Sequence, residues 1–92
     1  MSFLYQGSNE MRFRDDNHYL QNRAQYPIIG NRDGHVIRVH VRDCESLLRP
    51  IRLRQRLTRD YPKYGAHTID DLEHDAVRDG CTLSYDCDCQ QH

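Results

Sequence analysis

The last twelve residues, CTLSYDCDCQQH, contain three of the four cysteines of the chain and end on a histidine. Thiolate sulfur and imidazole nitrogen are the usual ligands of structural zinc, which binds four of them in a tetrahedron. The spacing C-x5-C-x-C-x2-H therefore predicts a candidate zinc site formed by Cys81, Cys87, Cys89 and His92, which Cys44 or His74 could complete. The alternative is that Cys81 is buried in a strand and that Cys87 and Cys89 are free thiols of a tail.

The remaining cysteine, Cys44, directly follows a predicted strand. A thiolate at a strand-to-helix turn can be activated by the helix N-terminus, and His40 or His35 from the strand could act as its base. The chain lacks a glycine-rich phosphate loop, a nucleophile elbow and a paired histidine–glutamate metal motif. The sequence therefore favours a binding protein over an enzyme.

A second group of metal-binding residue types is His67, Asp71 and His74, spaced i, i+4, i+7 on a predicted helix. This spacing places the three side chains on one helix face, although His67 precedes the helix cap. The simpler interpretation is a solvated polar face.

Arginine accounts for twelve of the 13 basic residues, and its planar guanidinium binds phosphate and carboxylate groups through two hydrogen bonds. One row is expected on the exposed side of a strand and another on one face of a helix. We expect the two rows to form a basic surface that binds nucleic acid or an acidic protein patch in a salt-sensitive way. The six candidate binding residues are Arg38, His40, Arg42, Arg52, Arg56 and Arg59.

The charges are strongly segregated, although the net charge of the chain is only −1. Residues 32–63 contain nine basic and four acidic residues, whereas residues 64–92 contain one basic and seven acidic residues. The acidic helix could therefore pair with the basic segment, within one chain or between the subunits of a homodimer. The alternative function is a zinc-stabilised homo-oligomeric interaction module, or a host-factor inhibitor of the viral or phage accessory type, acting through the acidic helix.

The elements that would position these residues predict an α+β fold. It consists of a small antiparallel sheet with a central β-hairpin at about 26–42, packed by two short helices at about 50–61 and 69–79, and a final short strand. The alternation of Ile37, Val39 and Val41 with polar residues indicates the strand, and GNRDGH supplies the hairpin turn. Thr68 is the expected N-cap of the second helix and Gly80 its left-handed C-cap.

The length of 92 residues predicts a single domain, with residues 86–92 as a C-terminal tail that is either flexible or metal-bound. Leu, Ile, Val and Phe together number only 19, so the core is thin and would benefit from a metal or a partner subunit. The sequence shows neither a secretion signal nor a membrane span, and we expect a cytoplasmic protein with reduced cysteines.

Overall fold

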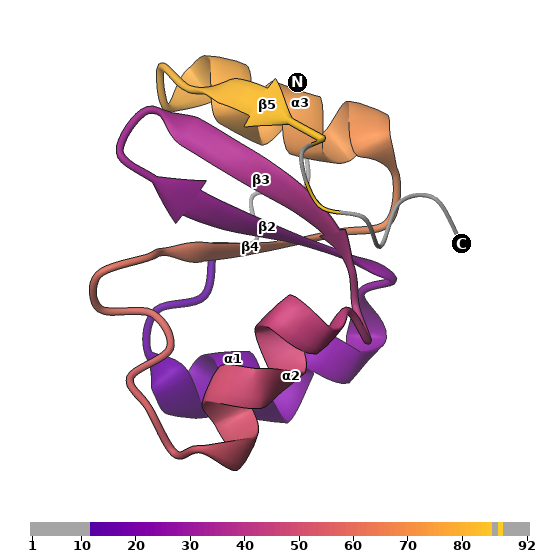
Figure 1. Ribbon diagram of the computed structural model, residues 1–92. Coiled ribbons are helices and arrows are strands. Elements are labelled where there is room, and N and C mark those ends of the chain that lie inside the picture. The colour runs from indigo at the N-terminus through magenta and orange to yellow at the C-terminus, as the bar shows by residue number, and fades with distance from the viewer. Residues whose placement is uncertain (1–11, 86, 88–92) are drawn as a thin grey trace.

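The computed structural model describes residues 12–85 and residue 87. A four-stranded mixed sheet with strand order β4-β2-β3-β5 forms the centre of the molecule (Figure 1). The elements in chain order are α1 (Asp16–Asn22), a 3-10 turn η1 (Arg23–Gln25), β2 (Ile28–Asp33), β3 (Val36–Val41), α2 (Glu45–Arg52), β4 (Lys63–Ala66), α3 (Ile69–Arg78) and β5 (Thr82–Ser84). The expected α+β class is confirmed.

The predicted central hairpin is also confirmed. β2 and β3 pair antiparallel in a register that runs from Ile28 opposite Val41 to Asp33 opposite Val36. The turn between them uses Gly34 with a φ of +65°, a backbone conformation that glycine adopts without a steric penalty. β4 adds antiparallel to β2, whereas the last strand, β5, pairs parallel with β3, so the sheet is mixed rather than purely antiparallel.

Helices cover both faces of the sheet (Figure 1). On one face, Leu72 and Ala76 of α3 pack in a cluster with Ile37 and Val39 of β3. On the other face, Tyr19 of α1 and Leu47 of α2 pack in a second cluster, which includes Ile29. His40 of β3, which we expected to face solvent, is therefore buried on the face that α1 and α2 cover.

The first predicted helix is displaced along the chain. We expected it at about 50–61, but α2 spans Glu45–Arg52, and the residues that follow form a loop as far as β4. The helix ends because Arg54 adopts a left-handed φ of 55°. In this conformation the amide of Gln55 donates to the Pro50 carbonyl and that of Arg54 to the Ile51 carbonyl, the two hydrogen bonds of a Schellman motif.

The second predicted helix agrees with α3. The hydroxyl of Thr68 accepts a hydrogen bond of 3.1 Å from the Asp71 amide, as expected for an N-cap. At the other end Gly80 has a φ of +72° and its amide donates to the Val77 carbonyl. Residues with the expected capping chemistry therefore fix both ends of this helix.

Met11 and Phe13 alternate in sequence with Arg12 and Arg14, which predicts a hairpin at the N-terminus, but most of that segment, residues 1–11, lies outside the described residues. The described segment that follows forms a bridge between Arg12 and Tyr64 of β4. The amide of Phe13 donates to the Lys63 carbonyl at 2.9 Å. This pairing brings the first described residues to the β4 edge of the sheet.

Candidate functional site

A group of metal-binding side chains is formed by His40, Cys44 and Cys87. One ligand atom from each residue lies within 4.8 Å of the other two. His40 and Cys44 are buried, and Cys87 is half-buried beside the same core cluster as Cys44. Two cysteines and a histidine supply three of the four ligands of a typical tetrahedral site. This group could hold a metal ion.

The topology of the sheet explains why residues so far apart in sequence meet. His40 lies near the end of β3, and Cys44 follows one turn later as the N-cap residue of α2. β5 runs parallel to β3, with Ser84 opposite Arg38. The chain therefore leaves β5 toward the end of the sheet where His40 and Cys44 lie, and it brings Cys87 there.

The two sulfur atoms of Cys44 and Cys87 are 3.2 Å apart. This separation is much longer than a disulfide bond, which measures about 2.0 Å. It is close to the roughly 3.8 Å that separates two sulfur atoms bound at about 2.3 Å to one tetrahedral zinc ion. A small outward shift of either side chain would make room for an ion.

The electrostatic environment keeps the third member of the group neutral. Burial lowers the pKa of His40 below its ordinary value of 6.5, and the positive charges of Lys63 and Arg38 lower it further. The neutral imidazole is the form that binds metals, because the protonated ring has no free lone pair. His40 is therefore a competent ligand at neutral pH.

The ligands predicted from sequence are only partly brought together. Cys81 lies in the core cluster on the opposite face of the sheet, where its thiol approaches the Asp79 carbonyl at 3.7 Å. Cys87 instead meets Cys44 and His40. Cys89 and His92 lie outside the described residues. The sequence did indicate that His40 is near Cys44, but we considered it there as a base and not as a ligand.

A second candidate site is an open cavity of about 690 Å³, which we call the arginine hollow. Its basic lining comes from two separate segments of the chain: Arg12 and Arg14 beside β4, and Arg56 and Arg59 in the loop after α2. All four side chains are exposed, and none of them forms an ion pair within residues 12–85. Asp15 and Asp16 also line the hollow, but four guanidinium groups without an ion pair among the described residues outnumber these carboxylates and favour the binding of an anion.

A single carboxylate holds the two halves of the arginine hollow together. Asp16 of α1 accepts hydrogen bonds from the backbone amides of Leu57 and Thr58, at 3.1 and 2.8 Å, and from the Thr58 hydroxyl at 2.8 Å. Burial opposes ionisation of this carboxyl, but these hydrogen bonds outweigh burial and lower its pKa below 3.8. Asp16 is thus occupied with backbone groups, although it lines the hollow.

The six predicted binding residues have different positions in the structure. His40 is only 4% exposed because helices cover its face of the sheet, so it is not part of any surface. Arg38 pairs with Asp33 at 3.2 Å, Arg42 lies 3.5 Å from Asp43, and Arg52 pairs with Glu45. Arg56 and Arg59 line the arginine hollow, but from the loop after α2 and not from a helix. Arg12 and Arg14 were missed, because only the fold places them beside the loop.

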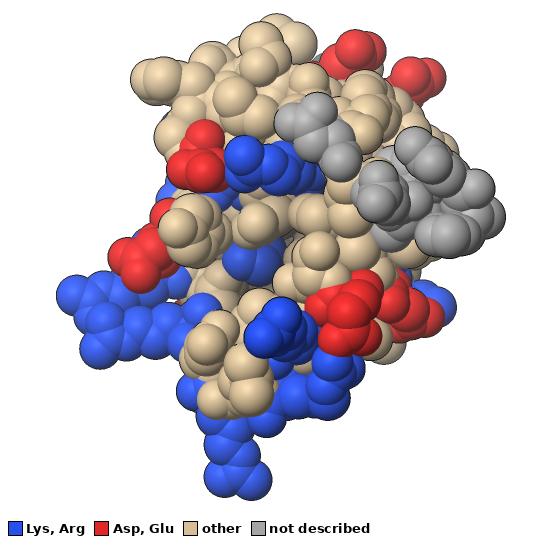
Figure 2. Space-filling view, viewed as in Figure 1, with Lys and Arg blue, Asp and Glu red and all other residues tan. Residues whose placement is uncertain are grey.

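Basic side chains gather mainly at one end of the molecule, whereas acidic side chains are spread more widely. Figure 2 shows most Lys and Arg over the end that carries α1 and α2, and acidic side chains both at the end that carries α3 and at the left and lower right of the view. On α3, Asp70 and Glu73 are exposed, whereas Asp75 is buried and pairs with Arg78 at 3.0 Å. The acidic helix of the same chain therefore does not neutralise the arginine hollow.

The predicted polar face of α3 remains solvated at its histidines. His67 and His74 are both exposed. The ring of His67 packs at a tilt against the ring of Tyr26, with the two ring centroids 5.1 Å apart. Among residues 12–85 and 87, the group of His40, Cys44 and Cys87 is the one whose atoms are close enough to share a metal ion.

No protein-family model, curated protein sequence or solved structure matches this chain. In the part of the chain that the structure describes, we find no helix with the length and apolar character required to cross a membrane. The geometry of the metal-binding group and of the arginine hollow is therefore what indicates a function.

Proposed function

We propose that this protein is a small non-enzymatic binding domain that engages a phosphate-rich partner, nucleic acid, through the arginine hollow. The observation that carries the proposal is the convergence of Arg12, Arg14, Arg56 and Arg59 without an ion pair among the described residues. Like charges held close together repel one another, and phosphate groups relieve that repulsion while releasing counterions.

The test is the affinity for a fluorescently labelled DNA duplex, measured by polarisation over a series of salt concentrations. Each phosphate contact contributes about −0.9 to the slope of log affinity against log salt. The double variant Arg12→Glu/Arg59→Glu should reduce the magnitude of this slope by roughly 2 and abolish binding at physiological salt. The matched control is Arg38→Glu/Arg49→Glu, which changes the net charge equally but leaves the lining of the hollow intact.

Two results would contradict this proposal. If neither protein nor variant binds the duplex at low salt, nucleic acid is not the partner and an acidic protein surface is the next class to test. If both double variants lose the same affinity, net charge alone determines binding and the hollow has no special role.

A second proposal concerns zinc: His40, Cys44 and Cys87 bind one zinc ion that stabilises the domain. The observation that favours it is the presence of a buried, neutral imidazole beside two thiols. A disulfide would involve only the two cysteines and would give the buried histidine no role. A thiophilic metal ion would bind the two cysteines and the histidine together. The fourth ligand would be water or a residue outside the described ranges, such as Cys89 or His92. Binding energy of such an ion contributes directly to folding, which suits a thin core.

Native mass spectrometry of protein purified without a chelator tests this site. We expect one zinc per chain, lost in Cys44→Ser and His40→Gln but retained in Cys81→Ser, the matched control from the opposite face of the sheet. Loss of zinc in Cys81→Ser alone would support the ligand set expected from sequence and overturn this one. An apo mass, or a mass lower by two hydrogens, would show that the cysteines hold no metal. The same spectra report the number of subunits and so test the expectation of a homodimer.

A further inference from the structure

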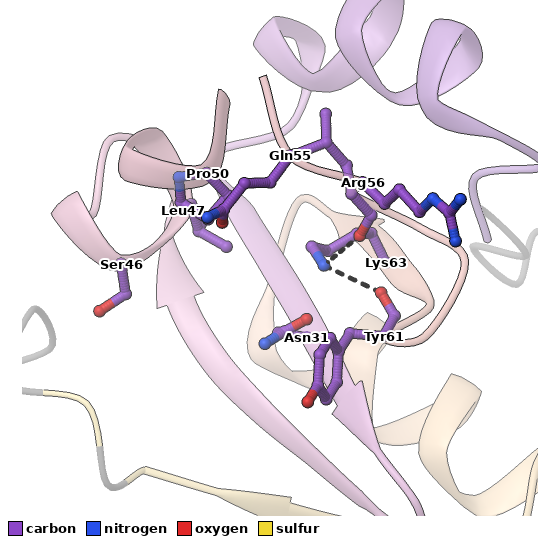
Figure 3. A pocket seen from close by; sticks show the side chains of 9 residues that line it. Asn31, Ser46, Leu47, Pro50, Gln55, Arg56, Tyr61 and Lys63 are labelled. Atoms are coloured by element: carbon purple, nitrogen blue, oxygen red, sulfur yellow. Dashed lines mark hydrogen bonds between the residues drawn. The ribbon is translucent and has the colours of Figure 1, made fainter. Parts of the chain in front are cut away.

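A second, smaller cavity of about 220 Å³ lies between α2, the loop that follows it and the sheet. We call it the Lys63 pocket. Lys63 of β4 and Asn31 of β2 lie side by side in it, because the two residues are cross-strand partners (Figure 3). Ser46 and Pro50 line it from α2, and Gln55 and Tyr61 from the loop. The pocket is therefore lined by two polar side chains of the sheet and by both polar and apolar side chains of α2 and the loop.

Lys63 is an unusually buried cation. Lys63 is only 7% exposed. Its ammonium group donates hydrogen bonds to the carbonyls of Leu57 at 2.5 Å and Tyr61 at 2.9 Å (Figure 3). Burial lowers the pKa of Lys63 to about 8, and Asp16 opposes that shift. The ammonium form therefore predominates at neutral pH. It has three N–H donors, and the described residues account for two of them.

Asn31, which lines the same pocket, carries an unsatisfied acceptor. Its Oδ1 atom is buried and has no hydrogen-bond partner among the described residues. A buried polar atom without a partner destabilises the fold, and a ligand that donates a hydrogen bond to it would recover that loss. A positive donor next to an unsatisfied acceptor is a pair that a group with both a negative oxygen and a hydroxyl would satisfy.

We propose that the Lys63 pocket binds a phosphate group that retains a proton, as inorganic phosphate or the end of a phosphate monoester. An anionic oxygen accepts the remaining N–H of Lys63, and the P–OH donates to Oδ1 of Asn31. The chemistry of the site excludes the phosphodiesters of a nucleic-acid backbone, because these have no P–OH. This proposal is separate from the binding of nucleic acid at the arginine hollow, although Arg56 lines both cavities.

Sulfate provides a sharp comparison, because it resembles phosphate in size and charge but has no proton to donate at neutral pH. The experiment is a titration of the isotopically labelled full chain with sodium phosphate and with sodium sulfate at matched ionic strength. The backbone amides of Asn31 and Lys63 and the Asn31 side-chain amide are followed by NMR. We expect saturable shifts with phosphate and about ten-fold weaker binding of sulfate, the loss that corresponds to one hydrogen bond involving a charged group.

Asn31→Asp changes the acceptor to a carboxylate with almost the same shape, which would pair with Lys63 and repel phosphate. This variant should lose phosphate binding by ten-fold or more while it remains folded. The matched control is Asn17→Asp, the same substitution at the arginine hollow, which should leave the shifts at Asn31 and Lys63 unchanged. Arg12→Glu/Arg59→Glu should also preserve these shifts, so a failure at one cavity is distinguishable from a failure at the other.

Three results would overturn the proposal. They are the absence of saturable shifts at these amides, equal affinities for phosphate and sulfate, and unchanged phosphate binding in Asn31→Asp. A parallel titration with glycerol 2-phosphate distinguishes the two sources of the ligand. Only a pocket with space beyond the phosphate group binds this monoester, whereas a pocket that fits the phosphate group alone binds only inorganic phosphate.

Discussion

At the scale of single residues, Asp16 has the clearest structural role. Its carboxylate holds the loop that carries Arg56 and Arg59 against α1 through three hydrogen bonds. We predict that Asp16→Asn destabilises the domain by about 1–2 kcal/mol at neutral pH, because hydrogen bonds to an ionised acceptor are the stronger ones. The same variant should weaken duplex binding, because the two pairs of arginines would no longer be held together.

The pH dependence of that effect follows from the lowered pKa of Asp16. The folded state binds the proton more weakly than the unfolded state, so the carboxylate stabilises the fold above pH 3.8 and this contribution is lost as pH falls through the folded pKa. Urea unfolding at pH 7 and below pH 3.8 should show a difference between the two proteins that shrinks with acidification. Asp60→Asn, at an exposed position of the same loop, is the control and should have little effect at pH 7. A difference that persists in acid would contradict the role of the charge.

Residue patterns correctly predicted which side chains of a strand share a face of the sheet. They did not predict which face of the sheet is covered by helices. The alternation in β3 correctly separates Ile37 and Val39 from His40. The buried position of His40 could not be inferred, because it depends on helices α1 and α2 that pack on that face. The closeness of His40 to Cys44 could be predicted, since only one turn of chain separates them. The approach of Cys87 required knowledge of the parallel pairing of β5.

At the scale of elements, Arg54 determines where α2 ends, and a non-glycine residue in the left-handed conformation costs about 1 kcal/mol or more. We predict that Arg54→Gly stabilises the domain by roughly 1 kcal/mol, measured by urea unfolding. The matched control is Arg49→Gly within α2, which should destabilise by a similar amount because glycine weakens a helix interior. Destabilisation by Arg54→Gly would show that the guanidinium makes contacts that outweigh the backbone strain.

The two predicted helices illustrate what local sequence can determine. Thr68 and Gly80 mark the ends of α3 chemically, and the prediction was accurate there. The end of α2 has no glycine or asparagine at the left-handed position, and the spacing of Leu53, Leu57 and Tyr61 resembles a helical stripe. Of these three, only Leu57 is buried, because the loop folds back over the sheet. A periodic pattern alone was therefore misleading where no cap supported it.

At the scale of the whole molecule, the segregation of charge along the chain becomes only a partial segregation in space, with the basic side chains mainly at one end and the acidic side chains more dispersed (Figure 2). The sequence could reveal the two blocks, but only the central sheet places α3 at the opposite end from α1 and α2. Pairing of the blocks between copies would therefore be head-to-tail, and such contacts form rings or open chains more readily than a closed dimer. The arginine hollow and the Lys63 pocket were likewise unpredictable, since each combines segments that meet only in the fold.

The parallel pairing of β5 has a consequence for resistance to mechanical force. β5 is three residues long and lies at the edge of the sheet, so a pull on the C-terminus would peel it away from β3 first. An ion shared by Cys87, Cys44 and His40 would transfer the load past this weak strand to the junction of β3 and α2. Proteolytic machines that thread substrates from the C-terminus would then meet their main barrier before β5 begins to separate.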